Sequence, residues 1–286
     1  MWPGPADAPP TTRIAMLAPS MQPSERRVAE AIATDVDLAV ERTAQEIADA
    51  VGVGRATVIR TAQTLGYDGY PQLRVALARE RATVAPAPDD TADATMLGAL
   101  RGAVDRFSAR LAQTVSAITE EDLTAFVDEL DASTRLLVAA NGLSAPVGAD
   151  LAMRLTSAGR PAEYVADTLG QQITASLLGP GSACLVVSGS GVNRASIDVM
   201  TAARESGARV LAITSFPRSP VAEIADVALV VAPINDSFRD ELLHTSRAAL
   251  MLVTESVVGL LVRRRGDSAT AAQAATLSVL GHSLSE

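Results

Sequence analysis

The sequence has no lysine, one cysteine and two histidines, and these shortages exclude several kinds of site. The single cysteine, Cys184, rules out an internal disulfide, and its place in an apolar run predicts a small core residue. The two histidines, His244 and His282, argue against a histidine-rich metal centre. We therefore expect no metal site and no cofactor.

Long apolar runs and aromatic residues are also scarce. No apolar run reaches the ~18 residues of a membrane span, and the opening stretch "MWPGPADAPP" lacks the charged start and apolar middle of a signal peptide. We therefore expect a soluble cytoplasmic protein without a membrane segment. Hydrophobic residues make up 48% and aromatics only 3%, so a sizeable core must be built from Ala, Val, Leu and Ile.

The charge is unevenly distributed. The net charge of −9 argues against nucleic-acid binding by the whole surface. Residues 51–81, however, carry five arginines against two acids. This small basic patch on an acidic protein is consistent with a local nucleic-acid contact.

Composition divides the 286 residues into two modules. Proline enrichment predicts a disordered tail over residues 1–19. A helical module follows at 20–81, and "ATVAPAPDDTADAT" has the composition of a linker at 82–95. We expect the larger module at 96–265 and a loosely held C-terminal tail at 266–286.

The first module has the spacing of a helix-turn-helix. Thr43 and Glu46 form a capping box before one helix. Ala48 permits a close helix crossing, Gly52 permits the tight turn, and Val58 anchors the second helix. An ordinary helical hairpin with a solvated face remains the alternative.

The preceding stretch "PSERRVAEAIATD" begins with Ser24 as an N-cap candidate. The second helix of the motif should run from about Arg55 to Leu65. Its outward side chains can reach phosphates and base edges, so we expect it to bind DNA. These candidate DNA-binding residues are Arg55, Thr57, Arg60, Gln63 and Thr64.

The second module alternates strand-like and helical stretches. Fully apolar strands between helices indicate a parallel sheet covered on both faces. The expected fold class is α/β: a five-stranded, doubly wound parallel sheet preceded by an all-α domain. Such sheets bind ligands beyond the carboxyl ends of their strands. The five expected strands are "TRLLVAA", "AEYV", "ACLVVS", "ARVLAIT" and "VALVVAP".

Two loops follow strands of this sheet. In "AANGLSAPVGADLAMRL", Ser144 can cap the next helix, and "CLVVSGSGVN" leads into another helix. Helix N-termini offer unpaired N–H groups, hydroxyls add donors, and glycines let an anion approach closely, which suits a phosphate. The spacing is not that of a nucleotide-binding loop. The alternative is that the serines only cap helices. In the second loop the candidate effector-binding residues are Ser188, Gly189, Ser190, Gly191 and Asn193.

Both modules resemble known families. "SGSGVN" is similar to the phosphosugar loop Ser-x-Ser-Gly-x-Thr of SIS (sugar isomerase) domains, with Asn193 at the threonine position, and "ARVLAITSFPRSPVAEIADVALVV" matches the strands that follow. "PSERRVAEAI", "VGVGRATVIR" and "LGYDGYPQLRVAL" resemble the N-terminal domain of RpiR-type (MurR/RpiR) bacterial regulators. The resemblance extends from about residue 20 to 265. It implies that Ser144, Ser188, Ser190 and Asn193 surround the phosphate of a sugar phosphate.

The attached DNA-binding module favours a regulator over an enzyme. An isomerase would need a base beside the sugar carbons, and the candidates are Glu241, His244 and Glu255. We read them as surface or interface residues and assign no catalytic residue. Two alternatives stay open: a phosphosugar isomerase with an accessory helical domain, and a DNA-binding protein whose SIS domain only oligomerises.

The expected partners are operator DNA, a small phosphosugar effector and further copies of the chain. A homodimer or tetramer would match a palindromic operator, and an effector would bias the spacing of the DNA-binding modules. The stretch "RAALMLVTESVVGLLV" is too apolar for a free surface helix. We expect it to be buried in the domain core or in a subunit interface.

Overall fold

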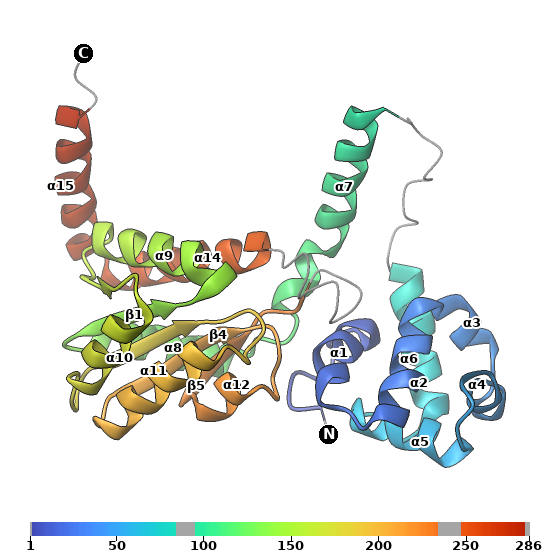
Figure 1. The fold of residues 1–286 in the computed structure, drawn as a ribbon. Helices are drawn as coiled ribbons and strands as arrows, with labels where there is room; N and C mark the ends of the chain where they lie inside the picture. The colour runs from blue at the N-terminus through green and yellow to red at the C-terminus, as the bar shows by residue number, and fades with distance from the viewer. Residues whose placement is uncertain (1, 84–94, 234–246, 284–286) are drawn as a thin grey trace. The chain divides into compact units, whose positions relative to one another are not determined.

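The computed structural model describes residues 2–83, 95–233 and 247–283. The chain forms two compact units. The first comprises residues up to Ile118 and a short segment from Ala232, and the second comprises Thr119–Val231 and the chain from Arg247 onward. Figure 1 shows the elements of both units.

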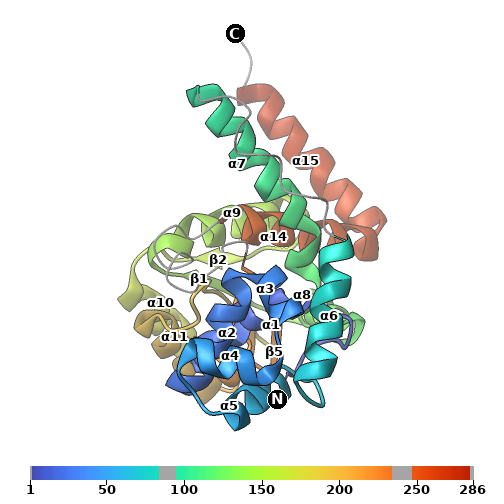
Figure 2. The same ribbon diagram turned by 90° about the vertical axis from the view of Figure 1, so that its right-hand side faces the viewer.

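The N-terminal unit is helical, as expected, and α1 to α6 are seen together in Figure 2. These helices share one core, in which Leu17, Ile32, Val58, Leu65 and Leu73 are fully buried. The helices are α1 (Pro10–Leu17), α2 (Pro23–Thr34), α3 (Val36–Glu41), α4 (Ala44–Val51), α5 (Arg55–Thr64) and α6 (Tyr70–Thr83), with the 3-10 turn η1 (Ala18–Ser20) after α1. After the undescribed segment come α7 (Met96–Leu111) and the 3-10 turn η2 (Ala112–Val115).

The start of the chain corrects two expectations. Residues 10–20 are helical rather than a disordered tail, because Ile14 and Leu17 are buried in the core that α2, α5 and α6 also build. Ser24 is not an N-cap: α2 begins one residue earlier at Pro23, with Gln22 as its cap residue. Proline suits the first helical position because it has no N–H to leave unpaired. The expected linker at 82–95 lies almost wholly outside the described residues.

The second unit contains the five expected strands in one parallel sheet. The order is β2-β1-β3-β4-β5, so the chain moves outward from β1 on one side and from β3 on the other. Ala140 and Val187, at the ends of β1 and β3, lie opposite each other in the register. The strands are β1 (Leu136–Ala140), β2 (Glu163–Tyr164), β3 (Ala183–Val187), β4 (Arg209–Thr214) and β5 (Val227–Val230).

Helices cover both faces of this sheet, as the fully buried apolar strands β1 and β3 require. Figure 1 shows α9 and α14 on one face and α10, α11 and α12 on the other. The second face holds Cys184, which is fully buried among aliphatic side chains, and burial raises the pKa of its thiol to about 12. The helices are α8 (Glu120–Ala132), α9 (Ala145–Ser157), α10 (Thr168–Ser176), α11 (Arg194–Glu205), α12 (Pro220–Ile224) and α14 (Arg247–Arg265), with the 3-10 turn η3 (Gly142–Ser144) before α9.

The end of the chain is more regular than expected. The helix α14 buries Leu250, Val253, Val257 and Leu261 within the unit. Residues 266–286 are not a plain tail, because they contain α15 (Asp267–Ser283). Within the described parts of the chain, no helix is long and apolar enough to cross a bilayer.

Candidate functional site

The two loops singled out in the sequence meet at the carboxyl edge of the sheet. They follow β1 and β3, the neighbouring strands at which the chain changes direction across the sheet. The N–H of Gly189 in the second loop donates a hydrogen bond to Ser144 Oγ in the first, over 3.3 Å. A switch point of this kind is where open α/β sheets bind ligands.

Two glycines in these loops are required by the local geometry. Gly142 and Gly191 have φ angles of +59° and +66°, in the left-handed region that favours glycine. At Gly191 space is also lacking, since an added Cβ would lie 2.2 Å from Ser219 Oγ and 2.9 Å from Thr214 Oγ1. The chain after β4 therefore packs directly against the second loop.

Asn193 connects the second loop to α11. Its Oδ1 accepts a hydrogen bond from the N–H of Ser196 over 3.2 Å, so Asn193 is the N-cap of this helix. Its Nδ2 lies 3.8 Å from where a Cβ on Gly142 would be. The amide group thus faces the first loop while it caps the helix.

The serines differ in their exposure. Ser144 and Ser188 are 6% and 3% exposed, whereas Ser190 is half-buried. In the part of the chain that the structure describes, Ser190 Oγ accepts one long contact, of 3.5 Å, from the N–H of Val192. Of the three, Ser190 has the hydroxyl best placed to meet a ligand.

A buried polar network beneath the loops was not foreseen. Asn141 Nδ2 donates to Gln171 Oε1 over 3.0 Å and to Ser196 Oγ over 3.2 Å. Gln171, which is fully buried, donates in turn to the carbonyl oxygen of Val165 over 2.8 Å. The network ties the ends of β1, α10 and α11 together. In the sequence Gln171 is followed directly by a second glutamine, Gln172, so the sequence does not show which of the two is buried in this network.

Arg247 was not predicted from the sequence as part of this site. At the start of α14, its Nη1 donates a hydrogen bond to the carbonyl oxygen of Leu143 over 3.0 Å. It brings a cation to the first loop from 104 residues further along the chain. A guanidinium there would favour an anionic ligand.

The structure describes only one of the three residues considered as catalytic bases. Glu255 forms an ion pair with Arg154, with 2.7 Å between Oε1 and Nη2, and both side chains are 43% exposed. This pair matches the expectation of a surface role. Glu241 and His244 lie outside the described residues.

The helix-turn-helix is formed by α4 and α5. The capping box of Thr43 and Glu46 is present, and the hydrogen bond that the Thr43 N–H donates to Glu46 lowers the pKa of this carboxyl. Gly52 ends α4 in the left-handed conformation, with φ of +71°. Val58 and Ala62 are fully buried, so they hold α5 against the core.

One predicted DNA-binding residue points elsewhere. Arg55, Arg60 and Gln63 are exposed and Thr64 is half-buried, but Thr57 is only 7% exposed. Thr57 shares the inward face with Thr61, whose hydroxyl donates to the Thr57 carbonyl oxygen over 2.9 Å. The expectation that Thr57 faces outward is therefore wrong.

Arg60 is restrained by neighbouring groups. Its Nη2 donates to Thr57 Oγ1 over 3.1 Å, and its Nε lies 3.7 Å from Glu25 Oε1. The Glu25 side chain is 15% exposed, against 58% for Arg60. An acidic group of α2 thus faces one of the arginines of α5.

Family models match both units. The helix-turn-helix domain of the rpiR family matches residues 11–84, and the SIS domain matches residues 129–254. An uncharacterised HTH-type transcriptional regulator of Haemophilus influenzae is 25% identical over 280 residues, covering 94% of this chain and 95% of that protein.

Solved structures share the fold. The Vibrio vulnificus NanR protein complexed with ManNAc-6P is 22% identical and covers 96% of this chain and 100% of its own, with a TM-score of 0.61. The sugar isomerase domain of an RpiR transcription factor from Sphaerobacter thermophilus is 24% identical and covers 62% of this chain and 97% of its own, with a TM-score of 0.55.

Proposed function

We propose that the SIS domain of this chain, which belongs to the RpiR family of helix-turn-helix transcriptional regulators, senses a small phosphosugar. The domain does not transform this ligand. The effector binds at the loops after β1 and β3. Its binding changes the affinity of the helix-turn-helix for operator DNA in the cytoplasm. Two copies of the chain bind a palindromic operator.

The convergence of the two loops supports this proposal most directly. The Ser190 hydroxyl, the Asn193 amide and the first turn of α11 lie together at the switch point, with Arg247 bound to the first loop. Donors and a cation at a helix N-terminus suit a phosphate group. The complex of NanR with ManNAc-6P, a relative with the same fold, makes a phosphosugar the first ligand class to test.

The direct test is calorimetric titration of the full chain with hexose, pentose and amino-sugar phosphates, with an assay for isomerised product alongside. We expect at least one of them to bind without turnover and to change the affinity for DNA. Turnover would identify an enzyme instead. Binding that leaves DNA affinity unchanged would contradict sensing.

Ser190→Ala tests the site itself. The change removes one donor to a charged group, worth about 1.5–3 kcal/mol, so effector affinity should fall roughly ten- to a hundred-fold. Ser176→Ala is the matched control, because its hydroxyl is exposed at the far end of α10 and donates to the carbonyl oxygen of Ile173. Equal affinities of the two variants would place the phosphate elsewhere.

A further inference from the structure

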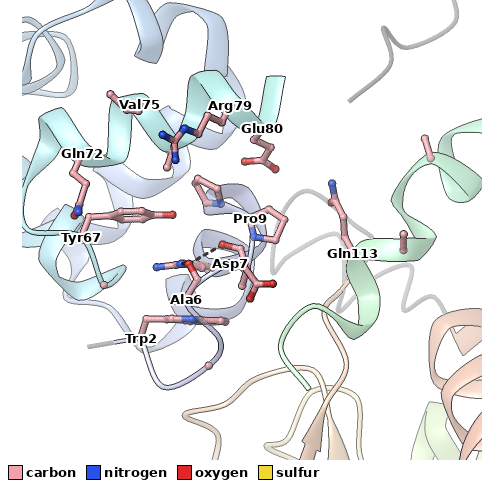
Figure 3. A pocket seen from close by; sticks show the side chains of 18 residues that line it. Trp2, Ala6, Asp7, Pro9, Tyr67, Gln72, Val75, Arg79, Glu80 and Gln113 are labelled. Carbon is pink, nitrogen blue, oxygen red and sulfur yellow. Dashed lines mark hydrogen bonds between the residues drawn. The ribbon is translucent and has the colours of Figure 1, made fainter. Parts of the chain in front are cut away.

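Arg13 in α1 is an arginine with only 3% of its surface exposed. Its guanidinium lies 5.4 Å from the ring centre of Trp2 and 4.6 Å from that of Tyr67. Figure 3 shows these two rings facing each other beside the N-terminal segment. Burial lowers the pKa of this guanidinium, but an arginine in a protein remains charged. A cation desolvated between aromatic faces is strongly held.

The same guanidinium joins the N-terminal segment to the end of α5. Its Nε donates to the carbonyl oxygen of Ala8 over 2.9 Å, and its Nη2 donates to that of Ala6 over 2.6 Å. Its Nη1 donates over 2.9 Å to the carbonyl oxygen of Leu65, the C-cap residue of α5. The last carbonyls of a helix lack partners and carry partial negative charge, which a buried cation satisfies.

Two further contacts fix the segment. Gly66, directly after the C-cap, has φ of +89°, and a Cβ there would lie 2.9 Å from Trp2 Cβ and 3.1 Å from Arg13 Nη1. On the other side, Glu80 of α6 accepts hydrogen bonds from the N–H of Thr11, over 3.1 Å, and from its hydroxyl. The segment therefore packs directly against the turn between α5 and α6.

We propose that residues 2–9 and Arg13 form a clasp that positions α5 for reading DNA, with Arg13 as the positioning residue. This inference rests on the proposed DNA binding by α5. The turn after Gly52 sets the start of α5, and Arg13 sets its end. Without the clasp the helix pivots on Val58 and Ala62. Base contacts demand an oriented helix, whereas attraction to phosphates does not.

The test compares two DNA duplexes with the full-length chain. One is the duplex that wild-type protein enriches from random-sequence DNA, and the other is its scrambled counterpart. For Arg13→Gln and Trp2→Ala we expect about ten-fold weaker binding to the enriched duplex, as for the loss of one charge-assisted contact. Binding to the scrambled duplex should change less than two-fold, with the same salt dependence.

Two further variants separate positioning from other effects. Trp2→Phe keeps an aromatic face over the guanidinium and should restore binding to the enriched duplex. Arg101→Gln removes the same charge from an exposed position in α7 and should bind like wild type. Trp2 is the single tryptophan of the chain, so its fluorescence reports on the clasp. Arg13→Gln should make it more accessible to acrylamide quenching.

Three results would overturn the proposal. Unchanged binding of Arg13→Gln to the enriched duplex would show that α5 needs no clasp. A parallel loss on both duplexes would show that Arg13 only keeps the unit folded, because a smaller folded fraction lowers both equally. Failure of the wild type to enrich any duplex would overturn the proposed DNA binding itself, and the clasp with it.

Discussion

Gly191→Ala should reveal how tightly the second loop of the SIS domain is built. A left-handed φ costs a non-glycine residue about 1–2 kcal/mol. The new Cβ would also lie 2.2 Å from Ser219 Oγ and 2.4 Å from Ser219 Cβ. Ser219 cannot turn away freely, because it is 4% exposed and its Oγ caps α12. Overpacking of this kind costs about 1–3 kcal/mol more.

Gly179→Ala isolates the second contribution. Gly179 also has a left-handed φ, of +75°, but a Cβ there meets no atom within 4 Å. The backbone strain and the lost freedom of the unfolded chain are thus shared by the two variants and cancel in their difference. The remaining difference, about 1–3 kcal/mol, measures the close approach of Ser219 to the loop.

Urea unfolding of the full chain supplies the measurement. Far-UV circular dichroism follows the loss of helices and sheet, and Trp2 fluorescence follows the N-terminal unit separately. Ser219→Gly should rescue Gly191→Ala in a double-mutant cycle, because it removes both clashing Ser219 atoms and glycine still tolerates the cap position. Equal destabilisation by Gly191→Ala and Gly179→Ala, with no coupling to Ser219, would refute the reasoning.

Three other predictions use single substitutions. Asn193→Asp should keep the cap of α11, and so the unfolding free energy, but weaken phosphosugar binding at least ten-fold in calorimetry, because it adds negative charge where the phosphate is proposed to bind. Glu25→Gln should tighten binding of Arg60 to DNA a few-fold at low salt, with the gain shrinking as salt rises, because it removes an opposing charge. Burial raises the pKa of Tyr70 to about 12. Its contribution to stability should be intact below about pH 10 and should fall by roughly 1.4 kcal/mol per pH unit as the pH rises to about 12. Tyr70→Phe should flatten this pH dependence in urea titrations.

The sheet was predictable because most of its strands are short, largely apolar runs that helical stretches separate. β2 is the exception, since neither Glu163 nor Tyr164 is buried. Each of the five runs forms a strand in one parallel sheet. The capping box at Thr43 was equally predictable, since it depends only on Thr43 and on Glu46, three positions later. Signals confined to a few neighbouring residues thus carried over into the structure.

The N-terminal segment shows where such signals fail. Proline and glycine enrichment is the same in a disordered tail and in a packed segment, so composition cannot separate the two. What orders this segment is Arg13, whose partner Leu65 is 52 residues away. The prediction that Thr57 faces outward was wrong for a related reason. Its helix was predicted well, but the face that meets the core depends on where α2 and α6 pack.

The structure also narrows where an anion could bind in the candidate site. Three N–H groups of the second loop are used internally: Ser188 donates to Ile213, Gly189 to Ser144 Oγ, and Gly191 to the Ser188 carbonyl oxygen. The Oδ1 of Asn193 accepts the hydrogen bond that caps α11, which leaves the Nδ2 of the same side chain as a donor for a ligand. Among the described residues, the donors left for a ligand are therefore the Ser190 hydroxyl, the Asn193 amide nitrogen and the first turn of α11. The buried serines build the framework that holds these donors in place, and for this reason we expect Ser190 rather than Ser188 to determine effector affinity.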